Sequence, residues 1–149
     1  KKKFWDADGL SPSMWTNGPA GAVMAQRFGA DADEVTGLVA NPRGHVASWL
    51  DRLAPKDAMR LVQSEIERLR PEARGALECV GMHSWARDPQ SGGDWAVFAP
   101  GQIQRFANQM AAPNGRVYFC GEHTARANRG MEGAMESAER AVVEASAIL

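Results

Sequence analysis

A ridge of small residues near the carboxyl end constrains this 149-residue chain more than any other feature. Its members recur at spacings of three and one, which places them on one face of a helix: Gly130, Gly133, Ala134, Ser137, Ala138 and Ala141. A helix face without large side chains lets a strand or a flat cofactor approach the backbone closely. We therefore predict a helix from residue 130 or 131 to 148.

The segment before this helix predicts where a ligand would bind. Residues 117–120 are apolar throughout, which is typical of a parallel strand covered on both faces. Gly121 and Glu122 follow it, at the end of the strand where open α/β sheets bind ligands. The Glu122 carboxylate can accept hydrogen bonds from ribose or ribityl hydroxyls, and the first turn of the helix offers unpaired N–H groups.

A simpler interpretation of the ridge is a helix packed tightly on a sheet with no ligand. Glu136, Glu139 and Arg140 would then form its solvated face. The ridge alone leaves both interpretations open.

The rest of the chain predicts a scaffold. Residues 1–41 contain short apolar runs bounded by Gly, Pro and Asn, which favour strands of a mixed or antiparallel sheet, and the chain opens on what resembles a strand end. Residues 77–85 resemble a further strand, and 101–110 a short helix. Two amphipathic helices are expected in 44–53 and 54–71, with apolar residues at helical spacing: Val46, Trp49, Leu50, Leu53, Met59, Val62, Ile66 and Leu69.

Charge and hydropathy exclude several classes of partner. Seventeen basic and eighteen acidic residues provide no electrostatic case for nucleic acid or an anionic membrane. No apolar run approaches the roughly 20 residues that a membrane-spanning helix needs, and no signal-peptide pattern is present. Cys79 and Cys120 sit in apolar stretches, which favours buried free thiols and a reducing compartment. We therefore expect a cytoplasmic protein.

The histidines suggest neither a metal site nor a catalytic triad. Cys120 and His123 have a spacing that zinc ligands use, but no second pair matches them, so we expect no metal. His83 alternates with Met82 and Trp85 in the expected strand and is interpreted as a structural histidine. No motif suggests a Ser-His-Asp or Cys-His arrangement.

The stretch "GRVYFCGEHTARANRGMEGAMESAERA", residues 115–141, closely resembles the carboxyl-terminal FAD-binding segment of the flavin-containing amine oxidase family. The family includes monoamine, polyamine and L-amino-acid oxidases. Weaker matches follow in the family's order: "FW" near the start, "RG..A" at 43–47, "W..DP...G.W" at 85–95 and "PGQ" at 100–102. The resemblance implies an α/β fold, with segments of a mixed-sheet substrate domain in 1–92 and the last strand and helix of a Rossmann-like FAD domain in 93–149.

The resemblance also implies roles for individual residues. Trp95 would be one wall of an aromatic cage, and Gly130 stands where monoamine and polyamine oxidases have a tyrosine as the second wall. Asp94 stands where monoamine oxidases attach flavin covalently, so non-covalent FAD is expected. Lys3 or Lys1 would hold a water near the flavin. The implied FAD contacts are Gly121, Glu122, His123, Thr124, Gly130, Met131, Glu132 and Ala134.

The activity implied is oxidation of an amine or L-amino-acid C–N bond by hydride transfer to FAD, giving an imine and, with O2, hydrogen peroxide. The family's G-x-G-x-x-G turn for the FAD pyrophosphate is absent, so we expect this chain to be a carboxyl-terminal part that needs the amino-terminal part of the enzyme. A homodimer is a further partner that we consider. The alternatives are an inert fragment that keeps the fold, or another FAD-dependent oxidase or desaturase.

Overall fold

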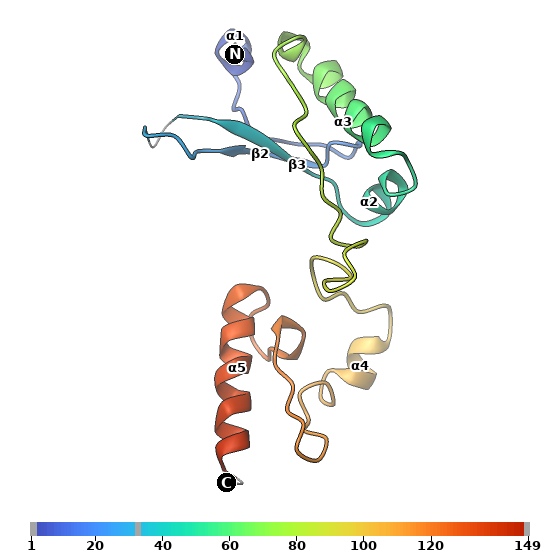
Figure 1. Cartoon of the computed structure of the whole chain (residues 1–149), viewed down its shortest axis with the longest axis vertical. Helices are drawn as coiled ribbons and strands as arrows, with labels where there is room; N and C mark the ends of the chain where they lie inside the picture. Colours follow the sequence, from blue (N-terminus) through green and yellow to red (C-terminus); the bar gives the residue numbers. More distant parts are fainter. Residues whose placement is uncertain (1–2, 32–33, 148–149) are drawn as a thin grey trace. The chain divides into compact units, whose positions relative to one another are not determined.

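The computed structural model describes residues 3–31 and 34–147, and these divide into two compact units, 1–92 and 93–149 (Figure 1). Lys1, one of the two lysines considered above, lies outside the described residues. Together the units hold a small antiparallel sheet and several helices, so the chain is mixed α/β. The parts of an enzyme to which the two units correspond stay a prediction.

The helices and strands follow the chain in a simple order. Their bounds are α1 Phe4–Asp8, β1 Met14–Trp15, β2 Ala22–Gln26, β3 Gly37–Asn41, α2 Gly44–Leu50, α3 Pro55–Leu69, η1 Pro71–Ala73, α4 Gln102–Phe106, η2 Glu122–Thr124 and α5 Met131–Ser146. None of the helices in the described residues is long and apolar enough to cross a membrane.

The sheet of the first unit confirms the predicted short strands. The strand order is β1-β2-β3 and both pairings are antiparallel, with Val23 of β2 opposite Ala40 of β3 (Figure 1). Turn residues bound each run, so the chain reverses between strands instead of crossing over. Five buried residues from several elements of this unit form one core: Phe4, Ala20, Val23, Ile66 and Ala73.

The helices α2 and α3 confirm the predicted amphipathic helices. Pro55 occupies the first turn of α3, where its missing N–H costs nothing, and the helix ends two residues before Pro71. Ile66 is buried in the core and Val62 packs against it, whereas Leu69 is partly exposed. Helical periodicity therefore identified the element and most of its buried face.

A buried ion pair joins the start of the first unit to the residue that follows α3. Arg70, which follows α3 and is 5% exposed, donates to both carboxylate oxygens of Asp8 in α1, from Nε at 2.5 Å and Nη2 at 2.6 Å. Its Nη1 donates to the carbonyl oxygen of Ser11 at 2.9 Å, and its guanidinium lies 5.0 Å from the Phe4 ring centroid. The pair thus holds α1 against the end of α3.

Two predicted strands of the first unit are wrong. The residues after Lys3 form the helix α1, because Phe4 is buried in the core and Gly9 ends the turn in the left-handed conformation with φ of 68°. Residues 77–85 form no strand, since no neighbouring segment pairs with them among the described residues, and Val80 is 94% exposed. An apolar run alone does not make a strand, because a strand also needs a hydrogen-bonding neighbour.

In the second unit, the small ridge of α5 packs against the chain's own loop at 121–128. A Cβ placed on Gly133 would lie 2.0 Å from the carbonyl oxygen of Asn128 and 2.7 Å from Cβ of Ala125. Ser137, also buried, accepts from the N–H of Gly121 at 2.8 Å and donates to the carbonyl oxygen of Ala134 at 2.7 Å. The close approach that the ridge predicted is made by this loop, not by a sheet.

The predicted strand at 117–120 is also wrong. Val117 makes only an isolated bridge across a turn to Asn114 and is 56% exposed, and no second strand of the described residues lies beside it. Cys120 and Cys79 are free thiols but exposed, so the expected burial of both is wrong. Cys120 is exposed for the same reason as Val117, since no neighbouring strand covers this segment.

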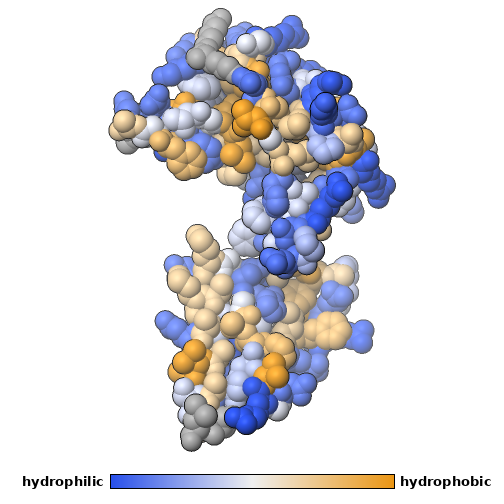
Figure 2. Space-filling view, viewed as in Figure 1, coloured by the Kyte–Doolittle hydropathy of each residue, from blue (hydrophilic) through white to orange (hydrophobic). Residues whose placement is uncertain are grey.

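Apolar side chains remain on the surface of the second unit. Met131, Met135 and Val142 of α5 recur at helical spacing and are 86%, 56% and 64% exposed. Figure 2 shows hydrophobic surface on both units. The buried ridge therefore accounts for only one face of this helix.

The Asp8–Arg70 pair predicts a dependence of stability on pH. The Arg70 guanidinium holds the pKa of Asp8 in the folded state below its ordinary value of 3.8. The contribution of the pair to stability is therefore complete above pH 3.8 and is lost as the pH falls through the lower pKa of the folded state. We expect Asp8→Asn to lower Tm by about 5 °C or more at pH 6 and to flatten the dependence of Tm on acid. Thermal unfolding of the full chain between pH 6 and pH 2 measures this, with Asp6→Asn on the exposed side of α1 as the control. Parallel curves for wild type and Asp8→Asn would contradict it.

The packing of Gly133 predicts that one added methyl group destabilises α5. We expect Gly133→Ala to cost about 1–3 kcal/mol, because the backbone of Asn128 must move away. Hydrogen exchange of the α5 amides should accelerate correspondingly. Gly81→Ala is the matched control, since a Cβ there meets nothing within 4 Å. Unchanged protection of α5 in Gly133→Ala would refute the role assigned to the ridge.

Candidate functional site

Glu122 is the centre of the polar contacts around the start of α5. Its Oε1 accepts the N–H of Ala96, and its Oε2 accepts the N–H of Gly130 at 2.9 Å. The pKa of Glu122 lies below its usual range, and the largest cause is the N–H of Ala96, followed by the N–H of Gly130. The nearby charges of Arg129 and His123 lower this pKa further. The carboxylate therefore stays ionised at neutral pH, and it ties the segment 93–98 to the first residue before the helix.

Arg129 holds the same segment through the carbonyl group of Ala96. Its Nη1 donates to the carbonyl oxygen of Ala96 at 3.0 Å, and its guanidinium lies 4.7 Å from the centroid of the Phe98 ring. Both backbone polar groups of Ala96 are thus bound by charged side chains, the N–H by Glu122 and the carbonyl by Arg129. No strand pairing stabilises 93–98 in the described residues, so these contacts take its place.

Trp95, the predicted wall of the substrate site, and Gly130, at the position of the family's second wall, lie together. A Cβ built on Gly130 would be 3.5 Å from ring carbons of Trp95, which is van der Waals distance. Gly130 has φ of 85° and ψ of −155°, a conformation that essentially only glycine adopts. The ring of Trp95 covers Gly130 on one side. Because Trp95 is 52% exposed, the rest of its surface faces outward.

The amino-terminal end of α5 is open. No side chain caps this sixteen-residue helix, and Met131, its first residue, is 86% exposed. The first N–H groups of a helix carry partial positive charge and have no partner within the helix. An electron-rich ring oxygen is the kind of group that they can bind.

The other predicted cofactor residues have different surroundings. Thr124 is buried, and its hydroxyl donates to the carbonyl oxygen of Gly121 at 2.9 Å, which gives it a role in the fold of the loop. His123 is exposed, with its ring close to the Cα of Gly121. Glu132 is exposed and Ala134 half-buried on α5. Their contacts with a cofactor stay predictions.

Two further predicted positions are exposed. Asp94 is exposed beside Trp95 in the second unit. Lys3 is exposed in the first unit, immediately before α1. Its role beside a flavin stays a prediction.

Sequence reasoning missed two arginines of the second unit. Arg140, which the ligand-free interpretation of the ridge placed on a solvated face, instead donates to the carbonyl oxygen of Phe119 at 2.9 Å and to Glu144 at 3.0 Å. Arg140 and Arg129 both bind backbone carbonyl oxygens of segments that lack strand partners. The only signal in the sequence was an arginine close to an irregular segment, and that signal does not name a partner.

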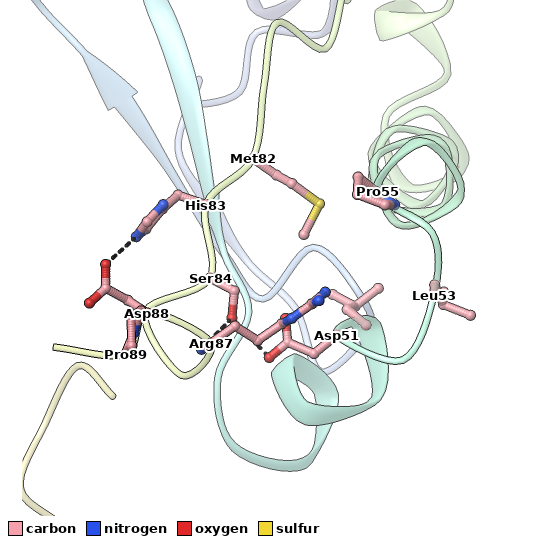
Figure 3. Close-up of a pocket in the computed structure, with 10 residues that line it drawn as sticks. Asp51, Leu53, Pro55, Met82, His83, Ser84, Arg87, Asp88 and Pro89 are labelled. Atoms are coloured by element: carbon pink, nitrogen blue, oxygen red, sulfur yellow. Dashed lines mark hydrogen bonds and ion pairs between the residues drawn. The ribbon is translucent and has the colours of Figure 1, made fainter. Parts of the chain in front are cut away.

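A second candidate site is an open groove of about 380 Å³ in the first unit (Figure 3). Ser84 donates from Oγ to Asp51 at 2.9 Å, and Nε2 of His83 lies 4.0 Å from a carboxylate oxygen of Asp88. Figure 3 shows the serine turned to Asp51 and the histidine turned to Asp88. Because Ser84 bonds the carboxylate and not the imidazole, the groove holds no activated nucleophile.

His83 was expected in a strand but lies in none. Its ring packs edge-on against Trp85, with the ring centroids 4.4 Å apart. In residues 3–31 and 34–147, no three His, Cys, Asp or Glu side chains gather in a way that could hold a metal ion.

Comparison with known proteins gives a consistent result. The sequence matches the family described as flavin containing amine oxidoreductase over residues 1–146. It is 29% identical over 144 residues to an L-amino-acid oxidase of Siganus canaliculatus, covering 93% of this chain and 27% of that protein. It is 26% identical over 139 residues to an L-amino-acid oxidase of Vipera ammodytes ammodytes, covering 91% and 29%.

A third relative is an L-glutamate oxidase precursor of Streptomyces diastatochromogenes, 33% identical over 102 residues, which covers 60% of this chain and 15% of that protein. The chain thus spans less than a third of the length of these curated relatives. The family match covers nearly every residue, including both units and the cluster around Glu122. This chain therefore belongs to the flavin-containing amine oxidoreductase family.

Proposed function

We propose that this chain is part of an FAD-dependent oxidase that oxidises the C–N bond of an amine or L-amino acid, giving an imine and hydrogen peroxide. The observation that carries the proposal is the position of Trp95 over Gly130 at the uncapped start of α5. An aromatic surface beside open helix N–H groups suits a flat, electron-rich cofactor and an amine that meets it. Membership of the family supports the same chemistry.

The residues present fit a flavin. The N–H groups at the start of α5, beginning with Met131, would face an electron-rich oxygen of the flavin ring, and their partial positive charge would favour negative charge there. Glu122 is ionised and accepts one backbone N–H on each oxygen, so lone pairs remain for a hydroxyl of the cofactor. When bound, FAD supplies the hydride acceptor, which no side chain can provide.

The chain's own residues would then bind and orient the substrate. Trp95 supplies an apolar wall, and Gly130, beneath its ring, adds no side chain of its own. Oxidation by hydride transfer needs no general base if the amine arrives neutral. A site walled by an aromatic ring favours the neutral amine, because an ammonium would have to lose its hydration shell there.

The remaining features of the whole protein are part of the proposal. Its partners would be the amino-terminal part of the enzyme, which would supply the pyrophosphate site of a Rossmann-like domain, together with the amine or amino acid, O2 and a second copy in a homodimer. We propose a cytoplasmic location and non-covalent FAD. The L-amino-acid oxidases and the L-glutamate oxidase precursor among the relatives support an amino acid as substrate.

Flavin content and peroxide production test the proposed function. The enzyme purified with its amino-terminal part should be yellow and should form peroxide with at least one member of a panel of amines and L-amino acids. A colourless protein that forms no peroxide with any of them would refute the proposal.

The contacts of Glu122 predict that Glu122→Gln loosens FAD. An amide presents one donor group where the carboxylate accepts two N–H groups, so one of the two contacts is lost. We expect FAD to dissociate about tenfold more readily, measured by flavin absorbance after gel filtration. Glu136→Gln, at an exposed glutamate of α5, is the matched control. Equal flavin retention in both variants would count against this role.

The lowered pKa of Glu122 adds a dependence on pH to the same experiment. FAD retention that relies on the ionised Glu122 carboxylate is complete above the usual glutamate pKa of about 4.3. It is lost only as the pH falls through the lower pKa that Glu122 has in the folded state. Loss of flavin near pH 6 would therefore point to a different group.

Asp94 predicts that FAD is released on denaturation. A carboxylate at this exposed position offers no thiol for a covalent bond to flavin. Acid precipitation of the flavin-loaded enzyme should leave a white pellet and a yellow supernatant, with full recovery of FAD by absorbance. A pellet that stays yellow after washing would show a covalent link.

A further inference from the structure

Within the site proposed above, the position of Trp95 depends on the residue that follows it. The segment 93–98 belongs to no helix or strand, so local hydrogen-bond ladders do not hold it. Its best-fixed point is Ala96, whose N–H is bound by Glu122 and whose carbonyl oxygen is bound by Arg129 at 3.0 Å. The Trp95 side chain projects from the residue directly before this point.

Arg129 is built to orient this segment. Arg129 directly precedes Gly130, the residue that the Trp95 ring covers. Because it also binds Ala96, which directly follows Trp95, Arg129 links the backbone on both sides of the Trp95–Gly130 contact. Its guanidinium also lies 4.7 Å from the Phe98 ring centroid, which fixes the plane of the group that donates to Ala96. Its charge is balanced by Glu122, whose pKa it helps to lower. The guanidinium is thus held by an aromatic face, a carbonyl oxygen and a nearby carboxylate.

We propose that Arg129 is a positioning residue that holds the Trp95 ring over Gly130 and thereby sets the size of amine or amino acid that the site admits. The inference rests on the proposed function only for its consequence on substrate, because the contacts themselves lie within this chain. Gly130 has no side chain and its backbone conformation excludes one, so the space beside Gly130 that a substrate would use is set by where the Trp95 ring sits. A displaced ring would change this space without altering the N–H groups at the start of α5.

The positioning role is tested first without any assay of activity. The chain contains five tryptophans, so 5-fluorotryptophan labelling gives separate fluorine resonances, and Trp95→Phe assigns that of Trp95. In Arg129→Met we expect the Trp95 resonance to move toward the value of an exposed ring while the others stay in place. Arg129→Lys, which keeps a donor for Ala96, should restore most of the wild-type shift.

Arg126→Met is the matched control, because Arg126 is an exposed arginine of the same loop whose side chain makes no hydrogen bond with the residues that the structure describes. It should leave the Trp95 resonance unchanged. A Trp95 resonance that is the same in Arg129→Met as in wild type would overturn the proposal.

The consequence for substrate choice is tested on the flavin-loaded enzyme with a series of amino acids of increasing side-chain size. In Arg129→Met we expect KM to change about fivefold or more, to different extents for small and large substrates, with kcat within about twofold and flavin retention unchanged. Equal KM changes for all sizes would refute the role in specificity. If wild-type enzyme binds flavin but oxidises no amine, the proposed function fails, whereas the Trp95 resonance still decides whether Arg129 positions that ring.

Discussion

The carboxylate of Glu122 is the constraint on which the second unit depends. One side chain accepts the N–H of Ala96 and the N–H of Gly130, and so joins a segment without secondary structure to the start of the longest helix of the unit. Arg129 completes the arrangement by binding the carbonyl oxygen of Ala96. Without a neighbouring strand, these charged side chains satisfy the backbone groups that a sheet would otherwise pair. The candidate site is a consequence of this arrangement, because it brings Trp95 onto Gly130.

The small ridge of α5 has a different role from the one that first suggested a cofactor. Gly133 and Ser137 are small because the loop 121–128 crosses the helix there, with Asn128 too close for any side chain at position 133. Only the open start of the helix, around Gly130 and Met131, remains for a ligand. Fold and site thus use successive turns of one helix. This explains why the ridge alone left both interpretations open.

The predictions that succeeded share a physical basis. The helix α3 was predicted from the spacing of Val62 and Ile66 between two prolines, because helical hydrogen bonds form within one segment and the buried face repeats at a fixed period. The strand expected at 117–120 was wrong because strands take their hydrogen bonds from other segments, and no partner follows from local sequence. Arg129 and Arg140 escaped prediction because the reach of a long side chain does not specify which carbonyl it binds.

The sequence by itself determined the family and the amphipathic helices, and it predicted Trp95, Glu122 and Gly130 as site residues, because motifs and helical periods are local properties of the chain. Tertiary structure alone decided how those residues are used. It placed Trp95 on Gly130, used Glu122 and Arg129 to hold Ala96, and turned the small ridge toward the chain's own loop. The reason is that the contacts of Trp95, Glu122 and Arg129 with their partners include ones between segments distant along the chain, and only the folded backbone brings these segments within hydrogen-bonding or van der Waals distance. The ridge meets a neighbouring loop, but the path of that loop across the helix is also set by the folded backbone.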